Sequence, residues 1–178
     1  AGSALMRDED LASRIIDSVV NAVSVPVTLK MRTGWDDDDR NAPRLARIAE
    51  EAGVKMLTVH GRTRCQMYNG AADWNFIGEV KRAVSIPVIA NVDIESVDDA
   101  VDCMAISGAD GVMIGRGAYG RPWFLNQVAH FPRDGTRLPD PSLGDQRRTL
   151  LEHVDAMLSH YGTRTGSRIA RKHIGWYT

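Results

Sequence analysis

Polar side chains follow four short apolar runs of this sequence, at the points where the runs end. They are Lys30 and Arg32, His60 and Arg62, Asn91 and Asp93, and Gly115 and Arg116. Each has an ordinary structural explanation: a lysine that ends a strand is usually solvated, a histidine there is often a hydrogen-bonded core residue, and Asn or Asp suits a turn. Four such ends in succession favour one shared site at the carboxyl ends of parallel strands.

The stretch GADGVMIGRGAYGR, residues 108–121, combines an apolar run with a glycine-flanked arginine. The run 111–114 predicts a fully buried strand of a parallel sheet. Gly115 and Gly117 let the backbone approach a ligand, and the Arg116 fork matches phosphate oxygens. A helix start near Pro122 would favour the same anion, so the stretch predicts a phosphate site. The alternative is a left-handed turn that carries a solvated arginine.

The strand-end set suits a flavin. A lysine ammonium near the pyrimidine edge of the isoalloxazine would stabilise the anionic reduced ring, and a histidine can hydrogen-bond the ring or a substrate carbonyl. The five histidines lack metal-ligand spacing with one another or with the two cysteines, so no metal site is expected. The sequence contains neither a Rossmann glycine fingerprint nor a Walker motif.

Helical and strand periodicities alternate around these residues. Leu11, Ile15, Val19 and Val23 recur every four residues, as in an amphipathic helix. The predicted helices are 10–23, 42–52, 74–84, 96–107 and 122–131, and the predicted strands are 27–31, 54–59, 87–90 and 111–114. Strands separated by helices at this spacing form parallel βαβ units. The expected fold class is therefore α/β, the C-terminal half of a TIM (β/α)8 barrel followed by the start of a small all-helical domain.

Three segments are expected along the chain. Residues 1–132 would form the flavin-binding half barrel, and the Pro- and Gly-containing segment 133–145 a linker. Residues 146–178 would form a helical domain, with a break at 162–166. Residues 1–130 hold 14 Lys/Arg against 18 Asp/Glu, whereas residues 131–178 hold 8 against 5. A basic tail beside an acidic body hints at a polyanionic partner.

Composition restricts the remaining classes. The chain has 178 residues and 43% hydrophobic residues, as expected for a globular domain, and no apolar run approaches the length of a membrane span. Two cysteines are too few for a disulfide scaffold and suggest a reducing, cytoplasmic setting. Cys103 lies on an apolar helix face and is expected to pack in the core, and Cys65 lies in a loop.

Five stretches resemble the tRNA-dihydrouridine synthase family, and most closely its bacterial DusB-like branch. They are VPVTLKMRTGW, LTVHGRTR, IPVIANVDI, GADGVMIGRGAYGRPW and IARKHIGWY. The resemblance covers nearly the whole chain. It implies an FMN-binding TIM barrel followed by a helical domain, both in contact with tRNA, and the NADPH-dependent reduction of a uridine C5–C6 bond.

The resemblance also implies roles for individual residues. Lys30 and His60 correspond to contacts of the flavin ring. Asn91, Asp93, Gly115 and Arg116 correspond to residues around the ribityl phosphate. Arg32 is expected near the substrate uridine or its phosphate, and the tail residues Arg168, Arg171 and Lys172 are expected on tRNA phosphates.

Two departures from the family pattern lead to further expectations. The family's catalytic cysteine belongs to an Asn-x-Gly-Cys-Pro motif that precedes a Gly-Ser-Ala-Leu stretch, here residues 2–5, so its place is expected upstream of Ala1. No catalytic residue is therefore assigned within the chain, and the 178 residues alone are expected not to reduce uridine. Val92 stands where the family usually has glycine beside the cofactor, and its side chain is expected to crowd that approach.

Two alternatives remain open. One is another FMN-binding barrel oxidoreductase that acts on a small pyrimidine, although it would not need the basic tail with Arg168, Arg171 and Lys172. The other is a non-catalytic RNA-binding or self-assembling half barrel. A four-strand half barrel has two open edges and an uncovered face, so the chain is expected to dimerise or aggregate.

Overall fold

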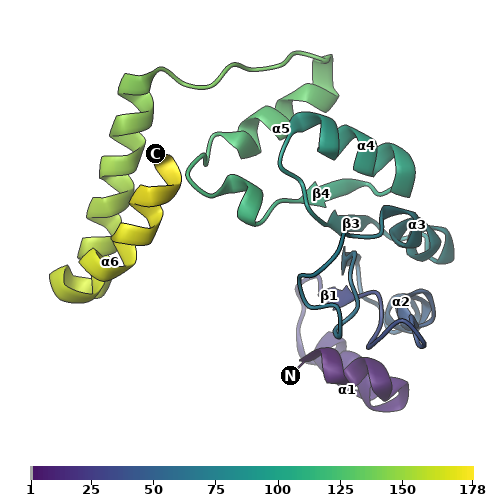
Figure 1. The fold of residues 1–178 in the computed structure, drawn as a ribbon. Coiled ribbons are helices and arrows are strands. Elements are labelled where there is room, and N and C mark those ends of the chain that lie inside the picture. The colour runs from purple at the N-terminus through teal and green to yellow at the C-terminus, as the bar shows by residue number, and fades with distance from the viewer. Residues whose placement is uncertain (1) are drawn as a thin grey trace. The chain divides into compact units, whose positions relative to one another are not determined.

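The computed structural model describes residues 2–178, and of residues 132–134 it describes only the backbone (Figure 1). Ala1 lies outside the described residues. The start of the expected half barrel at this residue, and the expected place of the family's cysteine upstream of it, therefore stay predictions.

Four strands alternate with helices along the first two thirds of the chain. The strands are β1 (Thr28–Arg32), β2 (Met56–His60), β3 (Val88–Asn91) and β4 (Gly111–Met113). Each lies within a residue or two of its predicted position, because short apolar runs between helical patterns leave little freedom for the assignment.

The strands form one parallel sheet in the order β1-β2-β3-β4. Strand order therefore equals chain order, and each crossover is made by one helix. Sequential parallel strands with intervening helices are the arrangement of consecutive units in a (β/α)8 barrel. The α/β class and the half-barrel pattern expected from the sequence are confirmed.

Helices cover one face of this sheet. Leu57, Val59, Val88 and Ala90 project to that face and are completely buried. They pack beneath α2 (Ala42–Glu51) and α3 (Trp74–Ala83), which contact β1 and β3 respectively. Figure 1 shows these helices and α4 (Val97–Ser107) along the same side of the strands. The completely buried Cys103 on α4 belongs to this core, as expected.

The expectation that 111–114 forms a fully buried strand is wrong. Val112 is only half-buried, and Met113 is 38% exposed. The reason is position in the sheet: among the described strands, β4 pairs only with β3 and so forms an edge. An apolar run predicts a strand, but it does not reveal whether the strand has neighbours on both sides.

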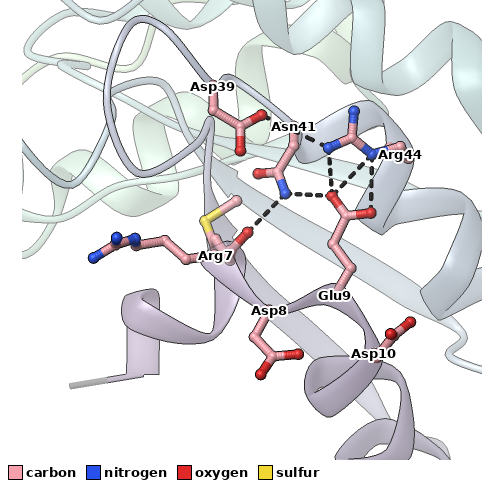
Figure 2. Close-up of a pocket in the computed structure, with 8 residues that line it drawn as sticks. Arg7, Asp8, Glu9, Asp10, Asp39, Asn41 and Arg44 are labelled. Carbon is pink, nitrogen blue, oxygen red and sulfur yellow. Dashed lines mark hydrogen bonds and ion pairs between the residues drawn. The ribbon is translucent and has the colours of Figure 1, made fainter.

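A glutamate carboxylate joins the N-terminal segment to the sheet unit. The segment comprises the short 3-10 helix η1 (Gly2–Arg7) and α1 (Glu9–Ala22). Figure 2 shows Glu9 between Asn41 and Arg44 at the start of α2. Both oxygens of Glu9 accept from Arg44 Nε at 2.9 Å, and the buried Asn41 amide donates to Glu9 and, at 2.7 Å, to the carbonyl of Met6. This Arg44 guanidinium holds the pKa of Glu9 below its usual value.

The rest of the chain is helical. It contains η2 (Arg116–Ala118), α5 (Phe124–Asp134) and α6 (Leu143–Tyr177). The irregular segment between α5 and α6 is therefore shorter than the expected linker 133–145. The predicted break in the last helix is confirmed at Gly162, whose φ of 75° and ψ of 160° lie outside the helical region.

Gly162 folds α6 back on itself as two antiparallel arms (Figure 1). Gly166 lies so close to the first arm that a Cβ there would stand 2.8 Å from the carbonyl oxygen of Met157.

The contacts between residues divide the chain into two compact units. The first holds the residues up to Ile94 with Asp98–Ile114, and the second holds Glu95–Val97 with Gly115–Thr178.

Within the described residues 2–178, no helix combines the length and the apolar character that a membrane span requires.

Candidate active site

The register of the first unit brings four predicted site residues to one face of the sheet. Arg32 pairs with His60, and His60 pairs with Asn91. Lys30 lies two residues before Arg32 and so projects to the same face. This face is opposite to the one that the helices bury, and Lys30 is exposed on it while Arg32, His60 and Asn91 are half-buried. The strand ends therefore form a polar, cationic surface.

Charge and burial keep the imidazole of His60 neutral. Desolvation, reinforced by the cations of Arg32 and Lys30, lowers the pKa of His60 to about 4. Partial desolvation by neighbouring groups, with a smaller contribution from the Arg32 charge, also lowers the pKa of Lys30. A neutral imidazole has one donor nitrogen and one acceptor nitrogen, so His60 can hydrogen-bond a ligand in either sense near neutral pH.

Arg32 is bound to the protein in this structure. Its Nη1 donates to the carbonyls of Thr63 and Met67 at 2.8 and 3.0 Å. Both acceptors lie on the loop that follows β2, and the Arg32 guanidinium carbon stands 5.8 Å from the ring centre of Tyr68 on the same loop. These hydrogen bonds occupy one nitrogen of the guanidinium, and the expected contact between Arg32 and the substrate stays a prediction.

Arg62 and Asp93 form an ion pair that sequence reasoning did not connect. Arg62 is only 3% exposed, and its two terminal nitrogens donate to the two carboxylate oxygens of Asp93, Nη1 to Oδ1 at 3.0 Å. The pair spans 31 residues of sequence. The signal that could have found it is the two-residue offset of each from its strand end, since residues after neighbouring parallel strands emerge at the same edge.

Asn91 ties the edge strand to the sheet. Its side-chain nitrogen donates to the carbonyl of Met113, its partner in the last ladder pair, at 3.1 Å. This bond joins two strands that are 22 residues apart in sequence, so it is not the local turn contact weighed as the alternative for Asn91 and Asp93. A contact of Asn91 or Asp93 with a cofactor stays a prediction.

The expectation that the Val92 side chain crowds a ligand stays a prediction, and the packing of this side chain argues against it. Val92 is 7% exposed, and its Cγ1 stands 3.1 Å from the place that a Cβ on Gly61 would take. The side chain is therefore packed against the start of the loop after β2. It lies in the interior of the first unit, and a contact of Val92 with a cofactor stays a prediction.

Gly115 and Arg116 belong to the second unit. No atom lies within 4 Å of the position where a Cβ on Gly115 would stand, so the backbone there is open to a ligand. The segment that follows is tied to the end of α6: the Tyr119 and Trp176 rings stack at 4.0 Å, and a Cβ on Gly120 would overlap the carbonyl of Trp176. No sequence pattern indicated that the glycine-rich stretch and the last helix pack together.

The second arm of α6 carries the predicted tRNA contacts. Arg168, Arg171 and Lys172 are all exposed. They differ in one respect, because Lys172 Nζ lies 4.8 Å from the ring centre of Trp176, a cation–π distance. Between the two arms, His153 and His173 meet edge to face at 4.8 Å. Sequence reasoning did not identify this histidine pair.

The dihydrouridine synthase (Dus) family model matches residues 1–178, the entire chain. The chain belongs to the dihydrouridine synthase family. A probable tRNA-dihydrouridine synthase of Rickettsia conorii is 55% identical over 178 residues, which cover 100% of this chain and 54% of that protein. A tRNA-dihydrouridine synthase B of Xanthomonas axonopodis pv. citri is 56% identical over 177 residues, 99% of this chain and 53% of that protein.

This family member spans about half the length of the curated relatives it matches. Among solved structures, a mandelate oxidase variant with benzoyl-formic acid aligns with a TM-score of 0.39 and 18% identity, over 82% of this chain and 49% of that one. The family resemblance read from the five sequence motifs is confirmed by the family model and by these relatives.

The residues present are compatible with a flavin mononucleotide. In the first unit, the ammonium of Lys30 and the neutral imidazole of His60 lie on one accessible face, where they can hydrogen-bond the polar edge of a planar ring. In the second unit, the open backbone at Gly115 precedes an arginine, a combination suited to a phosphate.

Proposed function

We propose that this chain forms the cofactor- and RNA-binding part of an FMN-dependent, NADPH-using tRNA-dihydrouridine synthase, which reduces the C5–C6 bond of uridine in tRNA. The family match over the whole chain supports the reaction class. The observation that carries the cofactor assignment is the common face of Lys30, Arg32, His60 and Asn91 at the carboxyl ends of the strands.

The chemistry of each side chain suggests a different role in binding the cofactor and the substrate. Lys30 would place a positive charge at the pyrimidine edge of the ring, and His60 would orient the ring or the substrate carbonyl through a neutral nitrogen. Gly115 and Arg116 would bind the phosphate, with Asn91, Asp93 and the Val92 backbone near the ribityl chain. The chemistry that bound FMN supplies is hydride transfer from NADPH to the pyrimidine.

The proton for C5 is assigned to the family's Asn-x-Gly-Cys-Pro motif, which residues 1–178 do not contain. Cys65 is exposed on a loop and Cys103 is buried, and neither is assigned that role. We therefore expect these 178 residues by themselves not to reduce uridine. The presence of two free cysteines fits a cytoplasmic enzyme.

Binding of tRNA is assigned to the exposed basic residues of the second α6 arm, Arg168, Arg171 and Lys172. Their charge disfavours the alternative of a flavin oxidoreductase that acts on a free pyrimidine, which has no phosphate chain to contact. Loss of tRNA binding at raised salt would support the RNA substrate, and equal turnover of free uridine would support the alternative.

A cofactor titration tests the assignment. Lys30→Met in a chain of the relatives' full length should weaken FMN binding about tenfold or more, because a charge-assisted hydrogen bond is lost. The matched control is Lys55→Met, an exposed lysine outside the polar face, which should leave the dissociation constant unchanged. Equal affinities of the two variants for FMN would show that Lys30 does not belong to the cofactor site. Absence of flavin absorbance with retained RNA binding would favour the non-catalytic RNA-binding module.

The sheet edge supports a second candidate, self-association of the 178-residue chain. β4 pairs with a single described strand, and its Met113 is exposed, so its outer edge can pair with another copy. Light scattering at low micromolar concentration should show a dimer or larger species. A monodisperse monomer would overturn this candidate and leave the enzymatic proposal unaffected.

A further inference from the structure

The loop between β2 and α3, residues 61–73, contains a strained backbone position beside the polar face. Met67 has a φ of 55°, a left-handed conformation, and it is the only non-glycine with positive φ among the residues that the structure describes. Such a conformation is strained, and it persists only where the surroundings hold it firmly. The contacts around Met67 identify what holds it.

The first part of the loop is fixed by backbone hydrogen bonds. The amides of Arg64 and Cys65 donate to the carbonyls of Gly34 and Trp35, at 3.0 and 2.9 Å. Thr63 and Gln66 brace each other, since each backbone amide donates to the other's side-chain oxygen. The loop up to Gln66 is therefore held mainly by these bonds, with one further bond from Arg32 Nη1 to the carbonyl of Thr63 at 2.8 Å.

The next four residues, Met67–Gly70, are held by the guanidinium groups of Arg32 and Arg62. Arg32 of β1 donates to the carbonyl of Met67 at 3.0 Å. Arg62 donates through Nε to the carbonyl of Asn69 at 3.1 Å and through Nη2 to that of Gly70 at 2.5 Å. The carboxylate of Asp93 balances the charge of the buried Arg62 and fixes the plane of its guanidinium.

These two arginines bracket Tyr68. The residue before it is bound by Arg32 and the residue after it by Arg62, while Tyr68 itself is 62% exposed. Its ring centre lies 6.2 Å from that of His60 at an interplanar angle of 43°. An aromatic ring on an exposed loop normally moves freely, and here the backbone on both sides of it is fixed.

We propose that Arg32 and Arg62 are positioning residues, which clamp the Met67–Gly70 segment on both sides of Tyr68 and make the loop a preformed wall of the active site next to His60. The inference rests on the proposed function for its catalytic consequence. A wall that is ordered before tRNA binds spares the complex the entropy of ordering it, so the clamp should act on substrate affinity more than on the chemical step.

Hydrogen exchange tests the clamp itself. The reporters are the amides of Met67 and Asn69, which donate to the carbonyls of Arg64 and Gln66. Arg62→Lys keeps the positive charge, but a lysine cannot donate through several nitrogens in the geometry of a guanidinium. Arg32→Lys is the second variant, in case the buried site of Arg62 does not tolerate a lysine. Both should raise exchange at these amides about tenfold or more, with strand β2 unchanged. The matched control is Arg44→Lys, which removes a carboxylate contact from a side chain that is 59% exposed.

Kinetics of a chain of the relatives' full length test the consequence. Arg62→Lys should raise KM for tRNA about tenfold, with kcat and the rate of flavin reduction by NADPH within about twofold of the parent. Unchanged exchange in both variants would overturn the clamp, and increased exchange with unchanged KM would overturn its role in substrate binding. If the parent does not reduce uridine at all, the proposed function fails, and the exchange experiment still decides the clamp.

Discussion

The arginines of the two units show how one residue type is used in opposite ways. At the strand ends, Arg62 is buried, and its fork is occupied by Asp93 and by loop carbonyls. On the second arm of α6, Arg168 and Arg171 are exposed and lie on a segment that has no acidic residue from Tyr161 to Thr178. The first kind holds the protein together, whereas the second kind is available to a partner.

Solvation is the physical reason for this division. A buried guanidinium has lost its hydration, and good hydrogen bonds must offset that loss, so removing it or its partner is strongly destabilising. An exposed guanidinium keeps its water and contributes little to folding, but it can release counterions when it meets a phosphate. Substitutions in the two places should therefore change different measurements.

The largest effect on stability is expected at the buried pair. Arg62→Met should lower the free energy of unfolding by about 3 kcal/mol, because it leaves two loop carbonyls and the Asp93 carboxylate without their donor. Urea denaturation of the protein gives the value. Arg44→Met, which breaks the exposed pair with Glu9, should have a much smaller effect. Similar losses for the two variants would contradict the distinction by burial.

A smaller loss of stability is expected at Val92. Val92→Gly should lower the free energy of unfolding by about 2 kcal/mol, since it removes a buried side chain and adds backbone freedom. It should not tighten flavin binding, because the valine side chain packs against Gly61 and not over the polar face. Thermal unfolding and an FMN titration measure the two quantities. Tighter flavin binding by the glycine variant would show that this side chain does obstruct the cofactor.

The exposed basic residues of the second α6 arm should affect binding alone. Replacing Arg168, Arg171 and Lys172 with glutamine should reduce the slope of log affinity for tRNA against log salt by about 2 to 3, because each lost phosphate contact releases fewer counterions. Stability should change by less than about 0.5 kcal/mol. The control replaces three exposed basic residues of the first unit, Arg14, Arg47 and Lys55. A slope that falls equally in the control would show that general charge is responsible.

A pH dependence of stability is expected from His60. Its folded-state pKa of about 4 lies below the ordinary value of 6.5, so between these values the unfolded chain binds more protons than the folded one. The His60 contribution to the free energy of unfolding should therefore be complete at about pH 7 and fall as the pH is lowered from 6.5 toward 4. His60→Gln should flatten this part of the curve, whereas the exposed-site control His160→Gln should not. Parallel curves for the parent and His60→Gln would mean that other groups cause the decline.

The sequence by itself determined the order and position of the elements and the family. Periodicity located the strands and helices because each pattern is local, with side chains alternating along a strand and recurring every turn along a helix. The same patterns placed Lys30, His60 and Asn91 at strand ends, and the parallel sheet then had to bring them to one edge. Gly162 likewise predicted the break in the last helix, because a glycine favours a non-helical backbone locally.

Only the tertiary structure decided which side chains are already paired with, or packed against, other residues of the protein. It paired Arg62 with Asp93, buried Val92 beneath a loop, exposed Met113 at an edge and stacked Tyr119 on Trp176. Each outcome depends on a neighbour far away in the chain, and local periodicity carries no record of that neighbour. A sequence pattern can therefore name a residue capable of binding a ligand, but burial and pairing determine whether its donors are still available.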